Sequence, residues 1–252
     1  MTAKKMFAVA SLLVAICLCG AAWERAAAPR VPSARPESPA VGEISGRITF
    51  EGEPPPLQEV DMSKDPVCAA ANKPPVYLED GKVNRDGTVP NAFVYIQAGA
   101  EKFSLTPPKK PAELNQVRCV YKPHVVGVMV GQELDIVSSD PTTHNVRVTP
   151  HLNPEWNHSQ PPGGAPLKKK FAHPEIMIFA DCNQHPWMEA YIGVTSNPFF
   201  AVSGDDGKFV IQGVPPGQFT LGAWTATFGT QERKVTVEPG QTVKADFVFK
   251  KP

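Results

Sequence analysis

The seven residues CNQHPWM, at positions 182 to 188, place a thiol, an imidazole and a thioether within one short stretch of chain. A thiolate and two imidazoles in a near-trigonal plane, with a weak axial thioether, are the donors of a type 1 copper site. Cys182, His185 and Met188 could supply three of these donors if the stretch is a loop between two strands, FADC before it and AYIGV after it. The second imidazole must then come from another strand.

His144 is the candidate for that second imidazole. It follows the polar loop SSDPTT and begins the apolar run HNVRV, which is typical of a strand. If this strand lies beside the strand that ends at Cys182, both side chains reach the same end of a β-sandwich. We therefore predict one copper ion with four ligands: His144, Cys182, His185 and Met188.

The number of cysteines supports this predicted copper site. Only Cys68, Cys119 and Cys182 follow the apolar N-terminal run, and an odd number leaves one thiol unpaired in an oxidising compartment. We predict a disulfide between Cys68 and Cys119, which stabilises the fold by about 4 kcal/mol in the loop-entropy description. Cys182 then remains for a metal, which deprotonates the thiol. The alternative is that Cys182 pairs with Cys119 and the loop side chains only pack.

The N-terminal residues point to export. MTAKK is followed by a continuous apolar run, the pattern of a signal peptide or an uncleaved anchor over residues 1 to 25. A Pro- and Ala-rich linker is expected over residues 26 to 41. We expect a periplasmic or extracellular protein, attached to a membrane only if the first segment is retained. Acidic and basic side chains balance at 25 each, so no nucleic-acid surface is indicated.

Short alternating apolar runs bounded by Gly, Pro, Asn and Asp predict an all-β protein. Asp-Gly turns predict hairpins at residues 77 to 84 and 204 to 209. The predicted strands are residues 43 to 51, 91 to 97, 127 to 139, 144 to 150, 175 to 182, 190 to 196, 207 to 214, 218 to 225, 232 to 240 and 242 to 250.

The two ends of the folded region resemble one module. ISGRITFEGEPPP and VPNAFVYIQ resemble the opening strands of a carboxypeptidase regulatory-like (transthyretin-type) β-sandwich, and DDGKFVIQGVPPGQFTLGAWTATFGTQERKVTVEPGQ resembles the remainder of it. The resemblance implies a discontinuous sandwich built from residues 42 to 111 and 197 to 252. Residues 112 to 196 would then be an inserted second β domain.

The inserted stretch resembles another family. GQELDIVSSDPTTHNV and FAHPEIMIFADCNQHPWMEAYIGV are similar to the cupredoxins of the plastocyanin and amicyanin group, and the short gap that holds Pro186 and Trp187 is most similar to amicyanin. This implies a Greek-key cupredoxin-like β-sandwich in which Asn145 braces the ligand loop. It also implies the roles of the ligands: imidazoles from His144 and His185, the thiolate of Cys182 and the axial thioether of Met188.

These expectations describe a one-electron carrier and not an enzyme. The resemblance implies that electrons pass through a partly exposed His185 to a transient partner, such as a c-type cytochrome or a periplasmic oxidoreductase. A first alternative is a metal-free binding or structural module of the cell envelope, since a fold does not fix a function. A second is copper storage or delivery, which extra methionine or histidine clusters would favour.

Overall fold

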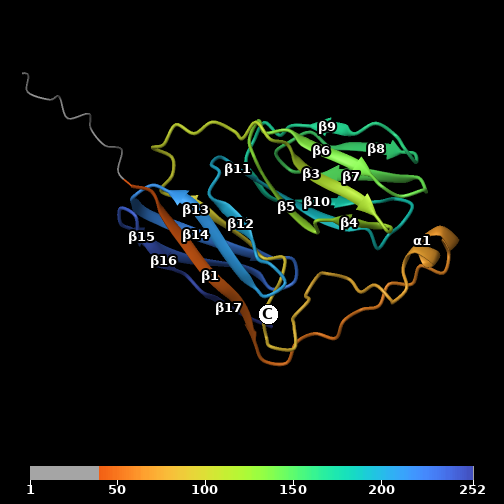
Figure 1. Ribbon diagram of the computed structural model, residues 1–252, viewed down its shortest axis with the longest axis horizontal. Coiled ribbons are helices and arrows are strands. Elements are labelled where there is room, and N and C mark those ends of the chain that lie inside the picture. The colour runs from red at the N-terminus through yellow and green to blue at the C-terminus, as the bar shows by residue number, and fades with distance from the viewer. Residues whose placement is uncertain (1–39, 252) are drawn as a thin grey trace, which may run out of the picture. The chain divides into compact units, whose positions relative to one another are not determined.

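The computed structural model describes residues 40 to 251. The expected signal or anchor segment, 1 to 25, and nearly all of the linker, 26 to 41, lie outside the described residues. The predicted all-β fold class is confirmed, because strands dominate the described chain and only one short helix interrupts them (Figure 1). Within residues 40 to 251, no helix combines the length and the apolar character that crossing a membrane requires.

The first β-sandwich is built from both ends of the described chain. In one sheet, β1 pairs antiparallel with β13 and parallel with β16 and β17; the other sheet has the order β12-β2-β14-β15. A single apolar cluster, which includes Ile44, Ile48 and Phe249, fills the space between the sheets. The strands are β1 (Gly42–Glu51), β2 (Phe93–Ala98), β12 (Phe200–Val202), β13 (Lys208–Val214), β14 (Gly217–Thr225), β15 (Gly229–Val237), β16 (Thr242–Lys244) and β17 (Phe247–Lys250).

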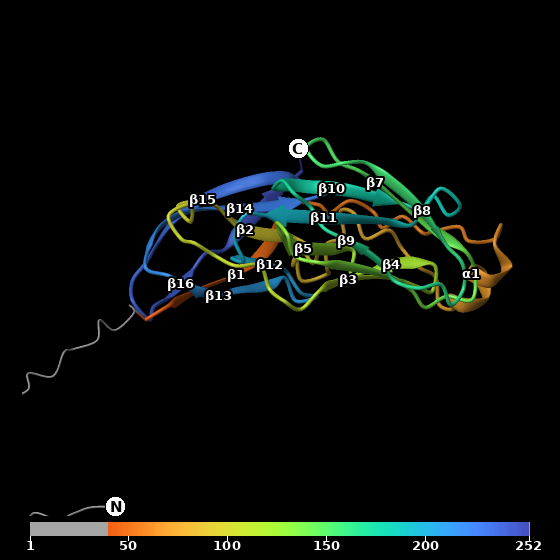
Figure 2. The ribbon, with the colours of Figure 1, turned by 90° about the horizontal axis from the view of Figure 1, so that it is seen from above.

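The second β-sandwich uses only the strands between β2 and β12. Its sheets have the orders β5-β11-β10-β7-β8 and β4-β3-β6-β9, with a separate apolar core that includes Leu114, Ile136 and Ile192 (Figure 2). This arrangement agrees with the expected insertion, although domain limits at 112 and 196 stay a prediction. The strands are β3 (Ala112–Val117), β4 (Val120–Lys122), β5 (Val125–Met129), β6 (Leu134–Ser138), β7 (His144–Thr149), β8 (Trp156–Gln160), β9 (Leu167–Lys169), β10 (Glu175–Asp181) and β11 (Glu189–Thr195).

Four local predictions were wrong. Residues 242 to 250 form two short strands, β16 and β17, and not one. Residues 127 to 139 do not form one strand, because a turn with Gly131 at φ 79° separates β5 from β6 and sends them to different sheets. Residues 77 to 84 contain a turn but no paired strands. The turn at 204 to 209 forms, with the Gly204 N–H donating to the Lys208 carbonyl at 2.9 Å, yet β12 and β13 on its two sides enter different sheets.

A pair of glycines lets the two sandwiches approach each other. Gly127 of β5 and Gly193 of β11 are register partners in parallel strands. A Cβ atom built on Gly127 would lie 2.2 Å from the Phe200 ring, and one built on Gly193 would lie 2.6 Å from the Phe93 ring. Because glycine has no Cβ, both aromatic rings of the first sandwich pack directly on the backbone of the second.

A long connection between β1 and β2 reaches the far end of the second sandwich. It carries the helix α1 (Pro66–Ala71), which lies near β4 in both ribbon views (Figures 1 and 2). Asp65 is the N-cap of this short helix and a proline opens its first turn, a combination that favours a helix start. The Cys68–Cys119 disulfide joins α1 to the tip of the β3–β4 hairpin, which confirms the predicted pairing.

Candidate metal centre

The CNQHPWM loop joins two neighbouring strands, as its sequence predicts. β10 ends at Asp181 and β11 begins at Glu189, and these two residues are register partners in antiparallel strands. Two backbone bonds close the loop: the Cys182 N–H donates to the Met188 carbonyl at 3.2 Å, and the Met188 N–H donates to the His185 carbonyl at 2.9 Å. The sulfur and imidazole on the loop are therefore held by the sheet.

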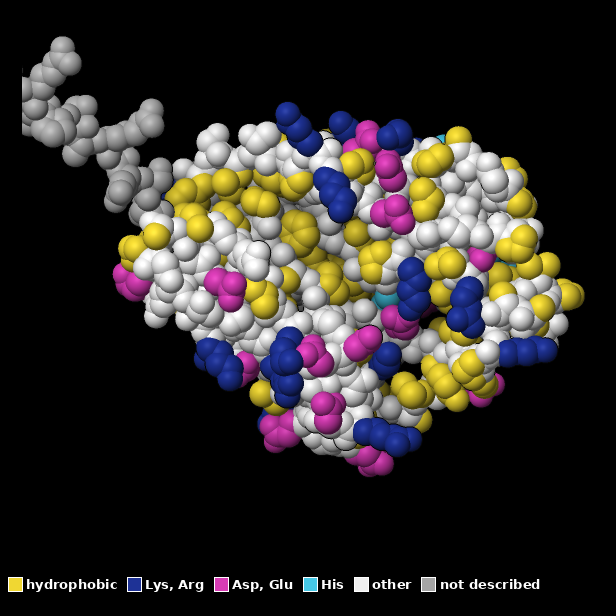
Figure 3. All heavy atoms as spheres, in the orientation of Figure 1, with side chains coloured by type: hydrophobic (Ala, Val, Ile, Leu, Met, Phe, Trp, Pro, Cys, Tyr) yellow, Lys and Arg dark blue, Asp and Glu magenta, His cyan; other side chains and the backbone are white. Residues whose placement is uncertain are grey.

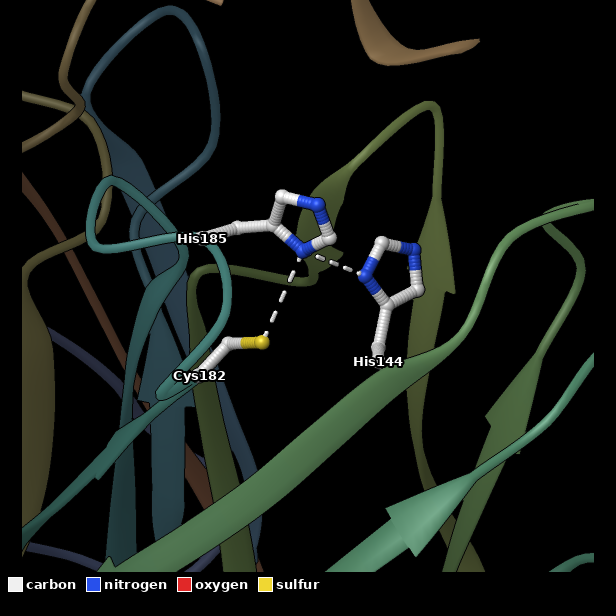
Figure 4. A group of neighbouring side chains, drawn as sticks. All are labelled: His144, Cys182 and His185. Atoms are coloured by element: carbon white, nitrogen blue, oxygen red, sulfur yellow. Dashed lines mark hydrogen bonds between the residues drawn. The ribbon is translucent and has the colours of Figure 1, made fainter. Parts of the chain in front are cut away.

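His144 reaches this loop because β7 lies next to β10 in the same sheet. Its Nδ1 lies 2.9 Å from Nδ1 of His185, and the Cys182 Sγ lies 3.7 Å from that same atom of His185 (Figure 4). A ligand atom of each of the three residues lies within 4.8 Å of the others. The three side chains are almost completely buried, with exposed fractions of 0%, 2% and 3% for His144, Cys182 and His185.

These donors fit a single metal ion. Bonds of about 2.0–2.1 Å from metal to imidazole nitrogen and about 2.3 Å from metal to thiolate sulfur can span both observed separations. Two imidazole lone pairs at 2.9 Å also repel each other unless a shared hydrogen or a metal ion lies between the nitrogens. Imidazole and thiolate together suit copper, zinc and iron, and a His₂Cys set with a weak thioether is characteristic of electron-transfer copper.

Met188 stands at the end of the ligand loop, directly before β11. Its side chain is fully buried in the same apolar cluster as Cys182. Its backbone forms the two loop bonds described above, which fix its position relative to Cys182 and His185. The Met188 side chain therefore belongs to the core of the second sandwich.

Each histidine presents its outer nitrogen to a carboxylate. Nε2 of His144 lies 2.8 Å from Oδ2 of Asp140, and Nε2 of His185 lies 2.9 Å from Oδ2 of Asp65. A carboxylate accepts a hydrogen bond from Nε2–H, which leaves the Nδ1 lone pair directed at the other donors. Sequence reasoning missed both carboxylates. Asp140 could have been found four residues before His144, whereas nothing in the sequence relates Asp65 to His185, 120 positions later.

The site favours a thiolate. Burial raises the pKa of Cys182, but a hydrogen bond with His144 and others with nearby backbone N–H groups outweigh burial and lower this pKa to about 6. The Asn145 N–H is among those donors, at 3.5 Å from Sγ. Burial lowers the pKa of His144, but the contact with Asp140 and the cysteine outweighs burial and raises this pKa to about 9. A thiolate and a cation therefore stabilise each other in this pocket.

Asn145 braces the ligand loop in the way the sequence implies. Its Oδ1 accepts the Asn183 N–H at 2.8 Å, and its Nδ2 donates to Oδ1 of Asn157 and of Asn183, each at 2.8 Å. One side chain thus connects β7, β8 and the residue after Cys182. This network holds the cysteine loop against the strand that carries His144.

The expectation of a partly exposed His185 was wrong. Asp65 and the segment around α1 cover its outer edge, and only 3% of the residue is exposed. The Trp187 ring packs against the His185 ring, with 5.2 Å between centroids, and the indole N–H donates to the Cys119 carbonyl at 2.9 Å. A neighbouring cavity of about 440 Å³ is lined by Trp187 and Val60, among others. His185 does not line this cavity, so the cavity does not expose its ring.

The alternative disulfide is also wrong. Cys119 is bonded to Cys68, and Cys182 is the free cysteine of the described residues. His124 is not part of the group of three donors: its Nε2 lies 2.7 Å from Oδ1 of Asp80, and its Nδ1 lies 3.1 Å from the Glu189 carbonyl. It therefore has a structural role at the edge of β11.

Comparison with known proteins gives one family match and several structural likenesses. Residues 183–250 match the carboxypeptidase regulatory-like domain family. No curated protein matches the chain. The chain is similar to the Cu-containing nitrite reductase of Thermus scotoductus SA-01, with 20% identity over 38% of this chain, 24% of that chain and a TM-score of 0.31.

Two smaller proteins are also similar to this chain. A purple cupredoxin from Nitrosopumilus maritimus has 17% identity over 33% of this chain and 99% of its own, with a TM-score of 0.29. The reduced state of an amicyanin mutant in which phenylalanine replaces a proline has 15% identity over 40% of this chain and 97% of its own, with a TM-score of 0.31.

Proposed function

We propose that this protein binds one copper ion in a mononuclear type 1 site and carries single electrons. The ligands are the Nδ1 atoms of His144 and His185, the thiolate of Cys182 and, as the axial donor, the thioether of Met188. The observation that carries the proposal is the convergence of two Nδ1 atoms and one unpaired sulfur in a buried pocket. A pKa near 6 for the thiol supports it, because the thiolate is the metal ligand.

A bound copper ion would supply one-electron redox chemistry. The protein's own residues prepare the donors for it. Asp140 holds the His144 ring with Nδ1 facing inward, and the Asn145 N–H supports the sulfur. Burial of all three donors excludes water from them. Because strands hold the ligands on both sides, the site keeps one geometry, which suits electron transfer between two oxidation states.

This burial favours a carrier over an enzyme. A substrate that reacts at a metal needs an open coordination position, whereas electrons can cross a thin layer of protein. The partner is proposed to be a c-type cytochrome or a periplasmic oxidoreductase, docking over less than about 1,200 Å² in total. Figure 3 shows charges of both signs interspersed on the visible face, in keeping with the balanced composition of 25 acidic and 25 basic residues.

The disulfide supports the proposed export. Disulfides persist in oxidising compartments, and Cys68–Cys119 joins two segments 51 residues apart. We therefore propose that the protein works in the periplasm or outside the cell. A membrane anchor would depend on the N-terminal segment, which lies beyond the described residues.

Two other functions would use the same fold differently. A metal-free envelope module would leave Cys182 an ordinary buried thiol, yet its lowered pKa and hydrogen bonds are those of a prepared thiolate. A copper delivery protein would use the same ligands but would exchange the metal readily. Full burial of the donors disfavours rapid exchange, so electron transfer remains the better proposal.

Copper addition followed by oxidation tests the proposal. The protein should take up one copper per chain and show an intense absorption in the red, because a copper–thiolate bond gives such a band. The Cys182→Ser variant should lose this absorption, whereas Cys68→Ser should keep it and lose stability. Colour that survives Cys182→Ser would refute the assignment of the thiolate ligand.

A further inference from the structure

The outer edge of His185 is covered by a segment that belongs to neither ligand strand. Asp65 lies in the connection between β1 and β2, and the Cys68–Cys119 disulfide ties this part of it to the β3–β4 hairpin. The hairpin tip in turn accepts the indole N–H of Trp187 from the ligand loop. The covering segment is thus linked to the ligand loop in two ways: directly through Asp65 and His185, and indirectly through the disulfide and Trp187.

The two carboxylate oxygens of Asp65 have different partners. Oδ1 accepts the N–H groups of Val67 and Cys68 at 2.9 and 3.0 Å, which caps the start of α1. Oδ2 lies 2.9 Å from Nε2 of His185. Because the cap fixes Oδ1, it also fixes the direction in which Oδ2 points. The side chain is therefore oriented before any metal binds.

Further contacts hold this geometry from the opposite side. Asn72, the C-cap of α1, donates from Nδ2 to the Arg118 carbonyl at 2.8 Å, and Nε of Arg118 donates to the Ala71 carbonyl at 3.0 Å. Arg118 and Cys119 have φ of 56° and 57°, a conformation that non-glycine residues rarely adopt. The N–H groups of both residues bond the Asp140 carboxylate, which also contacts His144. The same hairpin tip thus supports both histidines.

We propose that Asp65 is a positioning residue for the copper ligand His185 and that the disulfide holds it in place. The inference rests on the proposed copper site and deepens it. Acceptance of Nε2–H by a carboxylate fixes the ring orientation and makes Nδ1 a stronger donor. The negative charge also favours the more highly charged, oxidised copper ion. Asp65 therefore raises the affinity for Cu(II) and lowers the reduction potential, while it closes the imidazole edge to solvent.

The Asp65→Asn variant separates the two functions of this side chain. Asparagine is as good an N-cap as aspartate, so its Oδ1 keeps the bonds to α1. Its Nδ2 is a donor and cannot accept Nε2–H of His185. Asp61→Asn is the matched control, since the Asp61 carboxylate accepts only a local bond, from the Ser63 N–H at 2.9 Å, among its described contacts.

Chelator competition with Cu(II) and measurement of the reduction potential give the readouts. Asp65→Asn should bind Cu(II) about 10 to 100 times more weakly and have a more positive potential, with the red absorption band retained. Asp61→Asn should match the wild type in both, and Asp65→Glu should recover part of the loss. An affinity and a potential equal to those of the wild type in Asp65→Asn would overturn the proposal.

A copper-free measurement keeps this inference separate from the proposed function. In nitrogen-15 spectra of the protein without metal, the Nε2–H proton of His185 should exchange slowly with water. In Asp65→Asn it should exchange fast, while the control variant stays slow. If the wild-type protein fails to bind copper, that result refutes the proposed function and leaves the Asp65 contact to be judged by the exchange measurement. If Nε2–H is unprotected in the wild type, the Asp65 contact itself is refuted.

A double-mutant comparison tests whether the disulfide acts by holding Asp65 in place. Cys68→Ser with Cys119→Ser should weaken Cu(II) binding in the same direction as Asp65→Asn. If the disulfide acts by holding Asp65, adding Asp65→Asn to the serine pair should have little further effect, since residues of one network are not additive. Fully additive losses in affinity would show that the disulfide does not act through Asp65.

Discussion

Tyr121 shows how a single residue outside the ligand set positions the centre. Its hydroxyl donates to the Asn145 carbonyl at 2.6 Å and lies 3.1 Å from the Asp181 carbonyl, so it connects the strand of His144 with the strand that precedes Cys182. Burial raises the pKa of Tyr121 most, and the negative charges of Cys182 and Asp181 raise it further. The phenol therefore stays protonated and can donate throughout the physiological pH range.

Tyr121→Phe should destabilise the protein by about 1–3 kcal/mol, because it leaves a buried carbonyl without its donor. It should also broaden the copper absorption band, since the two ligand strands lose a link. Denaturant unfolding and the visible spectrum measure the two effects. Tyr77→Phe, at a side chain with 42% exposure, is the control and should change neither. A Tyr121→Phe protein as stable as the control would contradict this role.

At the scale of single residues, the convergence of His144, Cys182 and His185 could be predicted from the sequence, and the contact of Asp65 with His185 could not. Cys182, His185 and Met188 stand in one loop, so their spacing alone suggests a metal. Asp65 contacts His185 only because a disulfide brings a distant segment to it. The Asp-Pro pair at 65 and 66 predicts a helix start but contains no information about its neighbour in space.

Among the secondary-structure elements, β10 depends on a carboxylate at its first residue. Glu175 accepts the Leu152 N–H at 3.0 Å and a side-chain bond from Asn153 at 3.1 Å, and it also accepts the His151 N–H. Burial raises the pKa of Glu175, but these three hydrogen bonds outweigh it, so the pKa lies below the usual value. The loop after β7 is thereby fixed to the start of β10.

Because this pKa is lowered, Glu175 stabilises the fold above its unfolded-state pKa of about 4.3, and the stabilisation is lost as pH falls through the folded-state pKa. Glu175→Gln should therefore cost about 1 kcal/mol at pH 7, since the amide replaces one accepting oxygen by a donor. The difference from the wild type should shrink below pH 4. Thermal unfolding across pH measures it, with the exposed Glu155→Gln as the control. A pH-independent difference would contradict the assignment.

The sequence predicts strands with strong apolar alternation better than short polar strands. Long apolar alternation identified the strands that became β1, β10 and β14. The short strands β3, β8 and β9 have sequences rich in polar residues, AELNQV, WNHSQ and LKK, so their apolar pattern is weak. In the run 127 to 139, the apolar pattern predicts a strand that passes through Gly131, and only the backbone conformation shows a turn there.

For the whole molecule, the contact between the sandwiches depends on the two paired glycines. The insertion of one sandwich into the other follows from the resemblance of the chain ends to one module. The glycine contact could not be predicted, because it requires the register of β5 against β11. Gly127 has the Phe200 ring in the place where its Cβ would stand.

Gly127→Ala should destabilise the protein by about 1–3 kcal/mol, as added volume does in a packed interior. In combination with Phe200→Ala, which removes the nearer ring, the added cost of Gly127→Ala should become smaller; the part that remains comes from the Phe93 ring, 2.8 Å from the same Cβ position. Denaturant unfolding of the two single variants and the double variant measures this coupling. Equal costs of Gly127→Ala with and without the Phe200 ring would contradict the packing described for this junction.

Copper-edge X-ray absorption of the metal-loaded protein tests the central claim most directly. The account predicts one copper per chain with one short sulfur bond and two imidazole nitrogens, and it predicts that the short sulfur bond disappears in Cys182→Ser. Coordination by nitrogen and oxygen alone in the wild-type protein, or a sulfur bond that persists in Cys182→Ser, would contradict it.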